Sequence, residues 1–382
     1  MVISRKPLQF FICTLMVCMS LINYANPLND TVVAKTKVHE VATTHGEKEA
    51  EAKDIKTEIK EFIDHHLQDS YDFNIFGYKN EAGEQKHIGF PLPVILYDNG
   101  VQVFSSSKFH HGEETAEVNG NFYQLHHNKI YKVESKNASF NEKHESTNIK
   151  PLDFSITKNV FMIFVVALLM FLLFRSLAKS YAKNGNIASG VGRIFEPIVL
   201  YVRDEIAIPN IGERHYKKYM SYLLTIFFFV WFLNIFGLTP FGINVTGNIA
   251  VTACLALLTF LITTFTAKKD YWGHIFWMPG VPVLMKIVLA PIELLGVFIK
   301  PFALMIRLYA NIVAGHIVLM SLIGLMFIFK SWLGSSLSFV LSFAISMIEI
   351  LVALLQAYIF TMLSALYFGS AVEEHHHEEA HH

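Results

Sequence analysis

The sequence predicts an all-α polytopic membrane protein that carries a small exported α+β or mostly β domain ahead of its membrane part. Three observations support this prediction. The 382 residues are 53% hydrophobic and only 16% charged, which is more apolar than soluble globular proteins usually are. Charged residues crowd residues 28–152, whereas residues 154–368 hold long apolar runs. The chain also opens with a short apolar stretch behind Arg5 and Lys6, as an export signal does.

The first 25 residues predict a signal peptide, with a retained membrane anchor as the alternative because Asn23 stands where cleavage favours a small residue. Residues 26–152 then form an exported soluble domain. Its stretch "PLPVILYDNGVQVFSS" holds two β-type runs around Asn99-Gly100, which is a hairpin signal. The many histidines of this domain are interpreted as solvated surface residues, and metal binding or pH sensing is the weaker alternative.

The membrane domain is expected over residues 153–368, with about five helical crossings, because its apolar runs are long enough to cross roughly 30 Å of hydrocarbon. A segment near 190–215 is broken by prolines and charges and is expected to lie along the membrane as an interfacial helix. The predicted crossings are 155–176, 219–238, 245–266 and the two long segments within 281–368, which divide near 330–334.

Basic residues after the first and third crossings, such as Arg175, Lys179 and Lys268, place those ends in the cytoplasm. The exported domain is then periplasmic, the His/Glu-rich tail of residues 369–382 is cytoplasmic, and the protein belongs in the cell inner membrane. Each of the last two segments is longer than one straight crossing needs, so we expect tilted or in-plane helices. Pro291 and Pro301 predict a break or bend in the first of them.

Polar residues interrupt both long segments. Arg307 stands in the middle of a membrane run, where a charge costs at least a few kcal/mol on insertion scales, and it cannot escape this cost by losing its proton. Glu293 lies about four helical turns before Arg307 and Asn311 one turn after it, so these three share roughly one face. His316 falls on the opposite side of that helix. In the second segment, Glu349 and Gln356 lie two turns apart on one face.

Each of these residues also has a structural interpretation. Lys286, near a helix start, can extend to the interface, and Asn311 or Gln356 alone could join two helices by a hydrogen bond. Glu349 or His316 alone could be a neutral core residue. One fixed cation, two carboxyls, an imidazole and two amides on adjacent helices instead indicate a proton relay around a charge.

Two motifs carry a resemblance to a known family. The stretches "IELLGVFIKPFALMIRLYANIVAGHI" and "LLQAYIFTMLSALYF", followed by "EEH", resemble subunit a of the F-type ATP synthases over residues 154–374. The resemblance implies that Arg307 faces the essential carboxylate of a rotating c-ring. It also implies a proton path from the exported side lined by Asn311, His316, Glu349 and Gln356. Glu293 would belong to the cytoplasmic path.

The resemblance further implies that the c-ring, subunit b and the other synthase subunits are partners, along with protons and membrane lipid. The net charge of −1 indicates no nucleic-acid partner. Many bacterial relatives have an acid where His316 stands and an imidazole where Glu349 stands. The exchange preserves the relay only if the two side chains are neighbours, so we predict that His316 and Glu349 approach each other. The exported domain is a second departure, and the resemblance assigns it no role.

The alternative function is a proton-coupled secondary transporter, which can also place charged side chains in membrane helices. Such transporters usually show repeats with matching broken helices, and the sequence shows none. No phosphate-binding glycine loop is present, so nucleotide chemistry would belong to partner subunits. The chain is therefore predicted to be a non-catalytic subunit that needs no cofactor and no metal. Proton coupling is expected, although the c-ring mainly chooses the ion.

Overall fold

The computed structural model describes most of the chain between residues 68 and 373. The predicted signal peptide and most of the His/Glu-rich tail lie outside the described residues. The described residues are 68–79, 85–112, 114–126, 128–133, 150–183, 190, 192–239, 243–277, 281–328 and 332–373.

The chain forms two compact units, and each of the five long helices contributes to both. The first unit comprises Met1–Phe164, Phe236–Ala250 and Val313–Met347. The second comprises Val165–Ile235, Val251–Ile312 and Ile348–His382.

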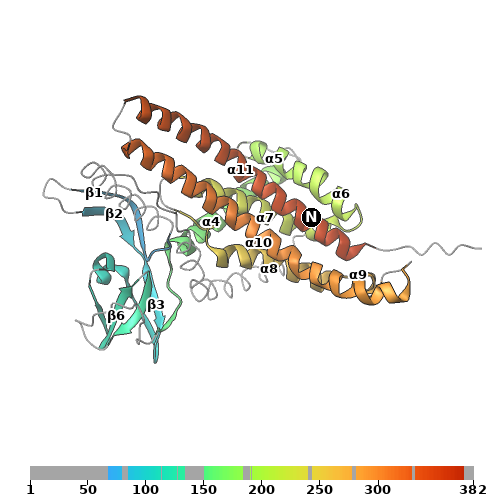
Figure 1. Ribbon diagram of the computed structural model, residues 1–382, viewed down its shortest axis with the longest axis horizontal. Coiled ribbons are helices and arrows are strands. Elements are labelled where there is room, and N and C mark those ends of the chain that lie inside the picture. Colours follow the sequence, from blue (N-terminus) through green and yellow to red (C-terminus); the bar gives the residue numbers. More distant parts are fainter. Residues whose placement is uncertain are drawn as a thin grey trace, which may run out of the picture. The chain divides into compact units, whose positions relative to one another are not determined.

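The described strands all belong to the first unit and form three small antiparallel sheets, drawn from blue to green in Figure 1. The sheets have the strand orders β1-β2, β4-β3-β8 and β5-β6-β7. The strands are β1 (Asp72–Lys79), β2 (Gln85–Pro91), β3 (Pro93–Tyr97), β4 (Val101–Ser105), β5 (Ala116–Val118), β6 (Asn121–His126), β7 (Lys129–Val133) and β8 (Leu152–Asp153).

The predicted hairpin is confirmed. Strands β3 and β4 pair with Tyr97 opposite Val101. Between them, Asn99 and Gly100 take positive φ values of 52° and 139°, which these two residue types adopt more readily than others. The core of this domain contains Val94, Leu96 and Tyr123, each 0% exposed. A 3-10 helix, η2 (Ser106–Gly112), adds Phe109 to it. In the described residues the domain that is predicted to be exported is therefore mostly β.

The strand domain leads directly into the first long helix, α4 (Lys158–Lys183). The backbone N–H of Lys158 donates to the carbonyl of Ser70 at 2.9 Å, and the N–H of Asn159 donates to the Asp69 carboxylate at 3.1 Å. These bonds satisfy amides that a helix start leaves without an intrahelical partner. The Phe161 ring contacts Phe73 edge-on at 5.6 Å, so the first turns of α4 pack on the domain.

Five described helices are long and apolar enough to cross a membrane, as predicted. These helices are α4, α7 (Tyr216–Gly237), α8 (Ile249–Thr266), α10 (Val283–Ile328) and α11 (Trp332–Val372). In Figure 1, α10 and α11 run alongside each other, and α11 continues into the first residues of the predicted tail.

The segment predicted to be interfacial forms α5 (Gly192–Tyr201), a π-helical turn η3 (Val202–Ala207) and α6 (Ile208–Ile211). None of these is among the candidate spans. That the segment lies on the membrane surface stays a prediction. A further short helix, α9 (Lys269–Phe276), connects α8 to α10.

The break predicted at Pro291 and Pro301 is absent, because α10 continues as one helix through both residues; a bend at these prolines stays a prediction. Proline is tolerated within membrane helices since neighbouring groups and small local adjustments satisfy the freed backbone carbonyl. In the second unit α11 packs closely on its neighbours. The ring of Phe368 stacks on Tyr219 of α7 at 4.6 Å. A Cβ atom placed on Gly369 would lie only 1.9 Å from the Asn210 carbonyl of α6, so only glycine fits at this approach.

Candidate functional site

Arg307 lies in the middle of α10, and its side chain is exposed. Among the residues that the structure describes, no hydrogen bond or salt bridge holds its guanidinium. Its charge acts on Tyr367 of α11, which is close enough for an electrostatic interaction. The sequence therefore places a permanent cation on a helix surface where the described residues supply no counter-charge.

Asn311 and Gln356 connect α10 to α11 next to the arginine. The Asn311 Nδ2 donates to Gln356 Oε1 at 2.8 Å. Asn311 is exposed one turn beyond Arg307, whereas Gln356 is only 1% exposed. The Nε2 atom of Gln356 is buried and has no protein partner in the described part of the chain. The structure thus brings two of the predicted path residues together and leaves one amide donor available for a further group.

Glu349 lies two turns before Gln356 on α11 and is half-buried. Both of its carboxylate oxygens are buried, and neither accepts a hydrogen bond from any described protein group. A buried carboxyl group without a protein donor is costly when ionised, and it invites either a proton or a water molecule. Glu349 is therefore chemically suited to hold and pass a proton.

His316 belongs to the first unit, where it is 7% exposed. Its Nε2 atom is buried and has no partner among the described residues. The same nitrogen lies 3.7 Å from the point where a Cβ atom on Gly237 would stand, so a glycine at the end of α7 leaves space beside the imidazole. Glu349 belongs to the second unit. The approach of His316 and Glu349 stays a prediction.

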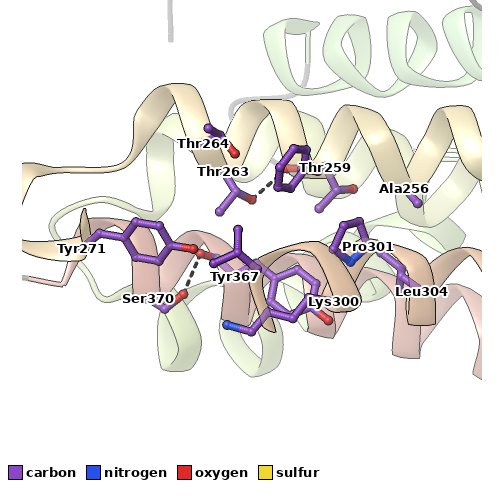
Figure 2. Close-up of a pocket in the computed structure, with 12 residues that line it drawn as sticks. Ala256, Thr259, Thr263, Thr264, Tyr271, Lys300, Pro301, Leu304, Tyr367 and Ser370 are labelled. Atoms are coloured by element: carbon purple, nitrogen blue, oxygen red, sulfur yellow. Dashed lines mark hydrogen bonds between the residues drawn. The ribbon is translucent and has the colours of Figure 1, made fainter. Parts of the chain in front are cut away.

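Glu293 lies nearer the start of α10 and is half-buried. Its charge acts on Tyr271 of α9: burial raises the pKa of the Tyr271 phenol, and the negative charge of Glu293 raises it further. Tyr271 in turn lines a small cavity in the second unit, shown in Figure 2. Glu293 is therefore linked through Tyr271 to this cavity.

The cavity is formed by residues of α8, α9, α10 and α11 (Figure 2). The space open to water centres is about 20 Å³, enough for roughly one water molecule. Its polar lining residues are Thr259, Thr263, Thr264, Tyr271, Lys300, Tyr367 and Ser370. Such a lining offers hydroxyl groups that can hold water between the helices.

The sequence analysis did not single out Lys300. Its Nζ lies 5.7 Å from the centre of the Tyr367 ring, and it lines the cavity. Lys300 lies seven residues after Glu293 and seven before Arg307, or about two helical turns from each. This spacing could have predicted that Lys300 shares their helix face. The threonines and Tyr271 gave no comparable signal, because the cavity is assembled from four separate helices.

The fold and the site define a polytopic membrane protein whose two last helices carry a line of polar side chains, with one exposed arginine. Residues 160–369 match the family model of the ATP synthase A chain, and this match covers more than half of the sequence. The chain belongs to the ATP synthase A chain family. This membership confirms the resemblance to subunit a of the F-type ATP synthases. It also agrees with the prediction that the chain is a subunit without catalytic activity of its own.

Three relatives named ATP synthase subunit a illustrate the similarity. The chain is 42% identical to that of Chloroherpeton thalassium over 237 residues, which are 60% of this chain and 70% of the relative. It is 41% identical to that of an Anaeromyxobacter species over 239 residues, covering 60% of this chain and 57% of the relative. It is 41% identical to that of Pelodictyon phaeoclathratiforme over 282 residues, covering 70% of this chain and 80% of the relative.

A second family model matches ahead of the membrane part. Residues 62–154 match a domain of unknown function, DUF8433, and the described strands β1–β8 lie within this range. The mostly β domain is therefore similar to a family of its own and ends where α4 is about to begin.

Proposed function

We propose that this chain moves protons through the membrane sector of an ATP synthase in the cell inner membrane. It would form two offset half-channels beside a rotating c-ring, with subunit b and the other synthase subunits as further partners. Family membership supports the assignment to the membrane sector of an ATP synthase. The assignment of roles to particular side chains rests on the geometry of α10 and α11.

The observation that carries the proposal is the state of Arg307. It is exposed in the middle of a candidate membrane span and has no counter-ion among the described residues of this chain. A charge is tolerated at such depth when it faces a partner charge or a polar path. A carboxylate carried past it on another subunit fits this requirement, because a nearby cation favours the ionised form of the acid.

Arg307 would then act on each arriving carboxyl group by lowering its pKa, so that the acid releases its proton on one side only. Since the guanidinium keeps its charge at every physiological pH, it would also repel protons that could otherwise pass directly between the two access paths. A neutral residue would do neither.

The first half-channel would run through the hydrogen-bonded pair Asn311–Gln356 and on to Glu349 and His316. Gln356, Glu349 and His316 each have a buried polar atom without a described protein partner. These atoms support the path, because a water molecule or a passing proton would supply the missing hydrogen-bond partner. We place it on the exported side. The second half-channel would begin at Glu293 and the cavity that Tyr271 and Lys300 line, on the cytoplasmic side.

The test is ATP-driven acidification of inverted membrane vesicles that hold the whole synthase complex. Arg307→Ala should abolish acidification while the ATPase subunits stay assembled, because the carboxylate loses its counter-charge. Lys286→Ala is the matched control: this lysine lies on the same helix, with its Nζ 4.6 Å from the Trp277 ring centre, and its loss should leave pumping nearly unchanged.

Undiminished acidification by the Arg307→Ala complex would make the arginine structural and defeat the proposal. The runner-up function, a proton-coupled secondary transporter, predicts proton movement that depends on a solute and not on ATP. Acidification without added sodium would support protons as the coupled ion.

A further inference from the structure

One face of the β4-β3-β8 sheet is apolar although it is exposed. Tyr97 is paired with both Val101 and Leu152, and the three are 53%, 66% and 43% exposed. In the next rows, Val103 is 62% and Phe154 48% exposed. An antiparallel sheet with one face on a core usually turns polar residues outward, so this sheet departs from the expected pattern.

The opposite face of the same sheet already packs on the core. Val94 and Leu96 are 0% exposed, and Phe104 is 8% exposed. The register places Ile95 opposite Val103 and Pro93 opposite Ser105, so the outer face carries no charged side chain. A contiguous exposed apolar surface of this kind marks a contact with a membrane or another protein.

The position of this face in the chain distinguishes between these partners. The N–H of Phe154 donates to the carbonyl of Ile95 at 2.9 Å, and that of Ile156 to the carbonyl of Pro93 at 3.1 Å. Lys158, held by Ser70, then begins α4, the first candidate span. The outer face is therefore connected to a membrane helix by a hydrogen-bonded segment rather than by an open linker.

Apolar side chains are also exposed at the start of the helix and beside it. Within the first unit, Phe161 of α4 contacts Phe90 at 5.4 Å, and Phe90 is itself 41% exposed. Along α4, Phe164 and Leu168 are exposed, as residues that face lipid are. Tyr97 adds an aromatic ring of the kind that proteins place at the membrane–water interface, and Phe154 adds a further exposed apolar ring.

We propose that the outer face of the β4-β3-β8 sheet lies on the lipid surface of the membrane that α4 enters. The strand domain is then a membrane-surface module, which has a role independent of the proton path. Its partner is phospholipid, bound through apolar and interfacial aromatic contacts rather than through a headgroup pocket.

Photo-cross-linking of the full-length chain tests this proposal. A benzophenone amino acid is placed at Val103 or at Val101, and the protein is reconstituted into phospholipid vesicles that contain a fluorescent phospholipid. The control position is Glu117, an exposed residue of β5 in the same domain. We expect lipid adducts at positions 103 and 101 and only background at position 117.

No adduct at either valine position, or equal adducts at all three, would overturn the proposal. An adduct between position 103 and another protein, in vesicles or in the native membrane, would do the same and would identify a protein partner instead. Two separate valine positions guard against a single variant that fails to fold, and proteolysis of each variant checks that the domain is intact.

Discussion

At the residue scale, the contact between Asn311 and Gln356 links the exposed arginine face of α10 to the buried face of α11. One partner is exposed and the other is nearly inaccessible. The bond therefore fixes the orientation of a buried amide whose second end, Nε2, remains available. On the proposed function, the pair would position this amide beside the path that includes Glu349.

Asn311→Ala should slow ATP-driven acidification by roughly 5- to 150-fold, because it leaves the buried Gln356 Oε1 without its donor, at a cost of about 1–3 kcal/mol. If the two amides act as one unit, the double variant Asn311→Ala, Gln356→Ala should be no slower than Gln356→Ala alone. Initial acidification rates of the four proteins, normalised to assembled complex, give this comparison. Fully additive losses would show that the hydrogen bond has no functional role.

Asp69, at the junction between the strand domain and α4, provides a pH test. Burial raises the pKa of its carboxyl group, although hydrogen bonds from Thr157 and from the Asn159 N–H oppose this. The folded form thus binds a proton more tightly than the unfolded form. The junction between the domain and α4 should therefore be more stable below this raised pKa and should lose stability as the pH rises through it.

Asp69→Asn should remove this pH dependence and should make the junction at least as stable as the wild type at pH 8, since an amide oxygen can still accept from Asn159. Protease susceptibility of the full-length chain at pH 5 and pH 8 measures the effect. Glu117→Gln, an exposed carboxyl in the same domain, is the control and should leave the pH dependence unchanged. A pH dependence that survives in Asp69→Asn would assign it to another group.

At the element scale, the five spans and the β3–β4 hairpin could be predicted from the sequence because each depends on local information: the length of an apolar run, or a turn pair such as Asn99-Gly100. The polar residues of α10 and α11 could be identified for the same reason, because the sequence alone shows a charged residue within an apolar run. The cavity beside Tyr271 and Lys300 could not be predicted, because four helices build it. The expected break in α10 did not form, because membrane helices can tolerate proline where other groups satisfy the freed backbone carbonyl.

The approach of α6 to α11 gives a prediction for packing. Gly369→Ala would place a methyl group 1.9 Å from the Asn210 carbonyl oxygen, so the helices must separate, at about 1–3 kcal/mol or more. The midpoint of thermal inactivation in detergent should fall. Gly296→Ala in α10 is the matched control, since no atom lies within 4 Å of its added Cβ. There the exchange should be neutral or stabilising by up to about 1 kcal/mol. Equal midpoints for both variants would contradict this account.

At the scale of the whole molecule, five crossings are an odd number, so the strand domain and the C-terminal tail should lie on opposite sides of the membrane. A protease-sensitive tag inserted after Gly120, in an open turn with φ +81°, should be cut from outside intact spheroplasts. The tail should be cut only in inverted vesicles. Cleavage of both from the same side would mean an even number of crossings.

The exposed state of Arg307 also bears on how the complex is made. On the proposed function, a newly inserted copy of this chain would carry a fixed charge toward lipid until a carboxylate-bearing neighbour arrived, and an isolated charge at that depth disfavours the inserted state. The unassembled subunit should therefore be the short-lived form, removed by membrane proteases when its ring is missing. The charge of Arg307, which is proposed to support proton movement, would then also make the lifetime of the subunit depend on assembly with the c-ring.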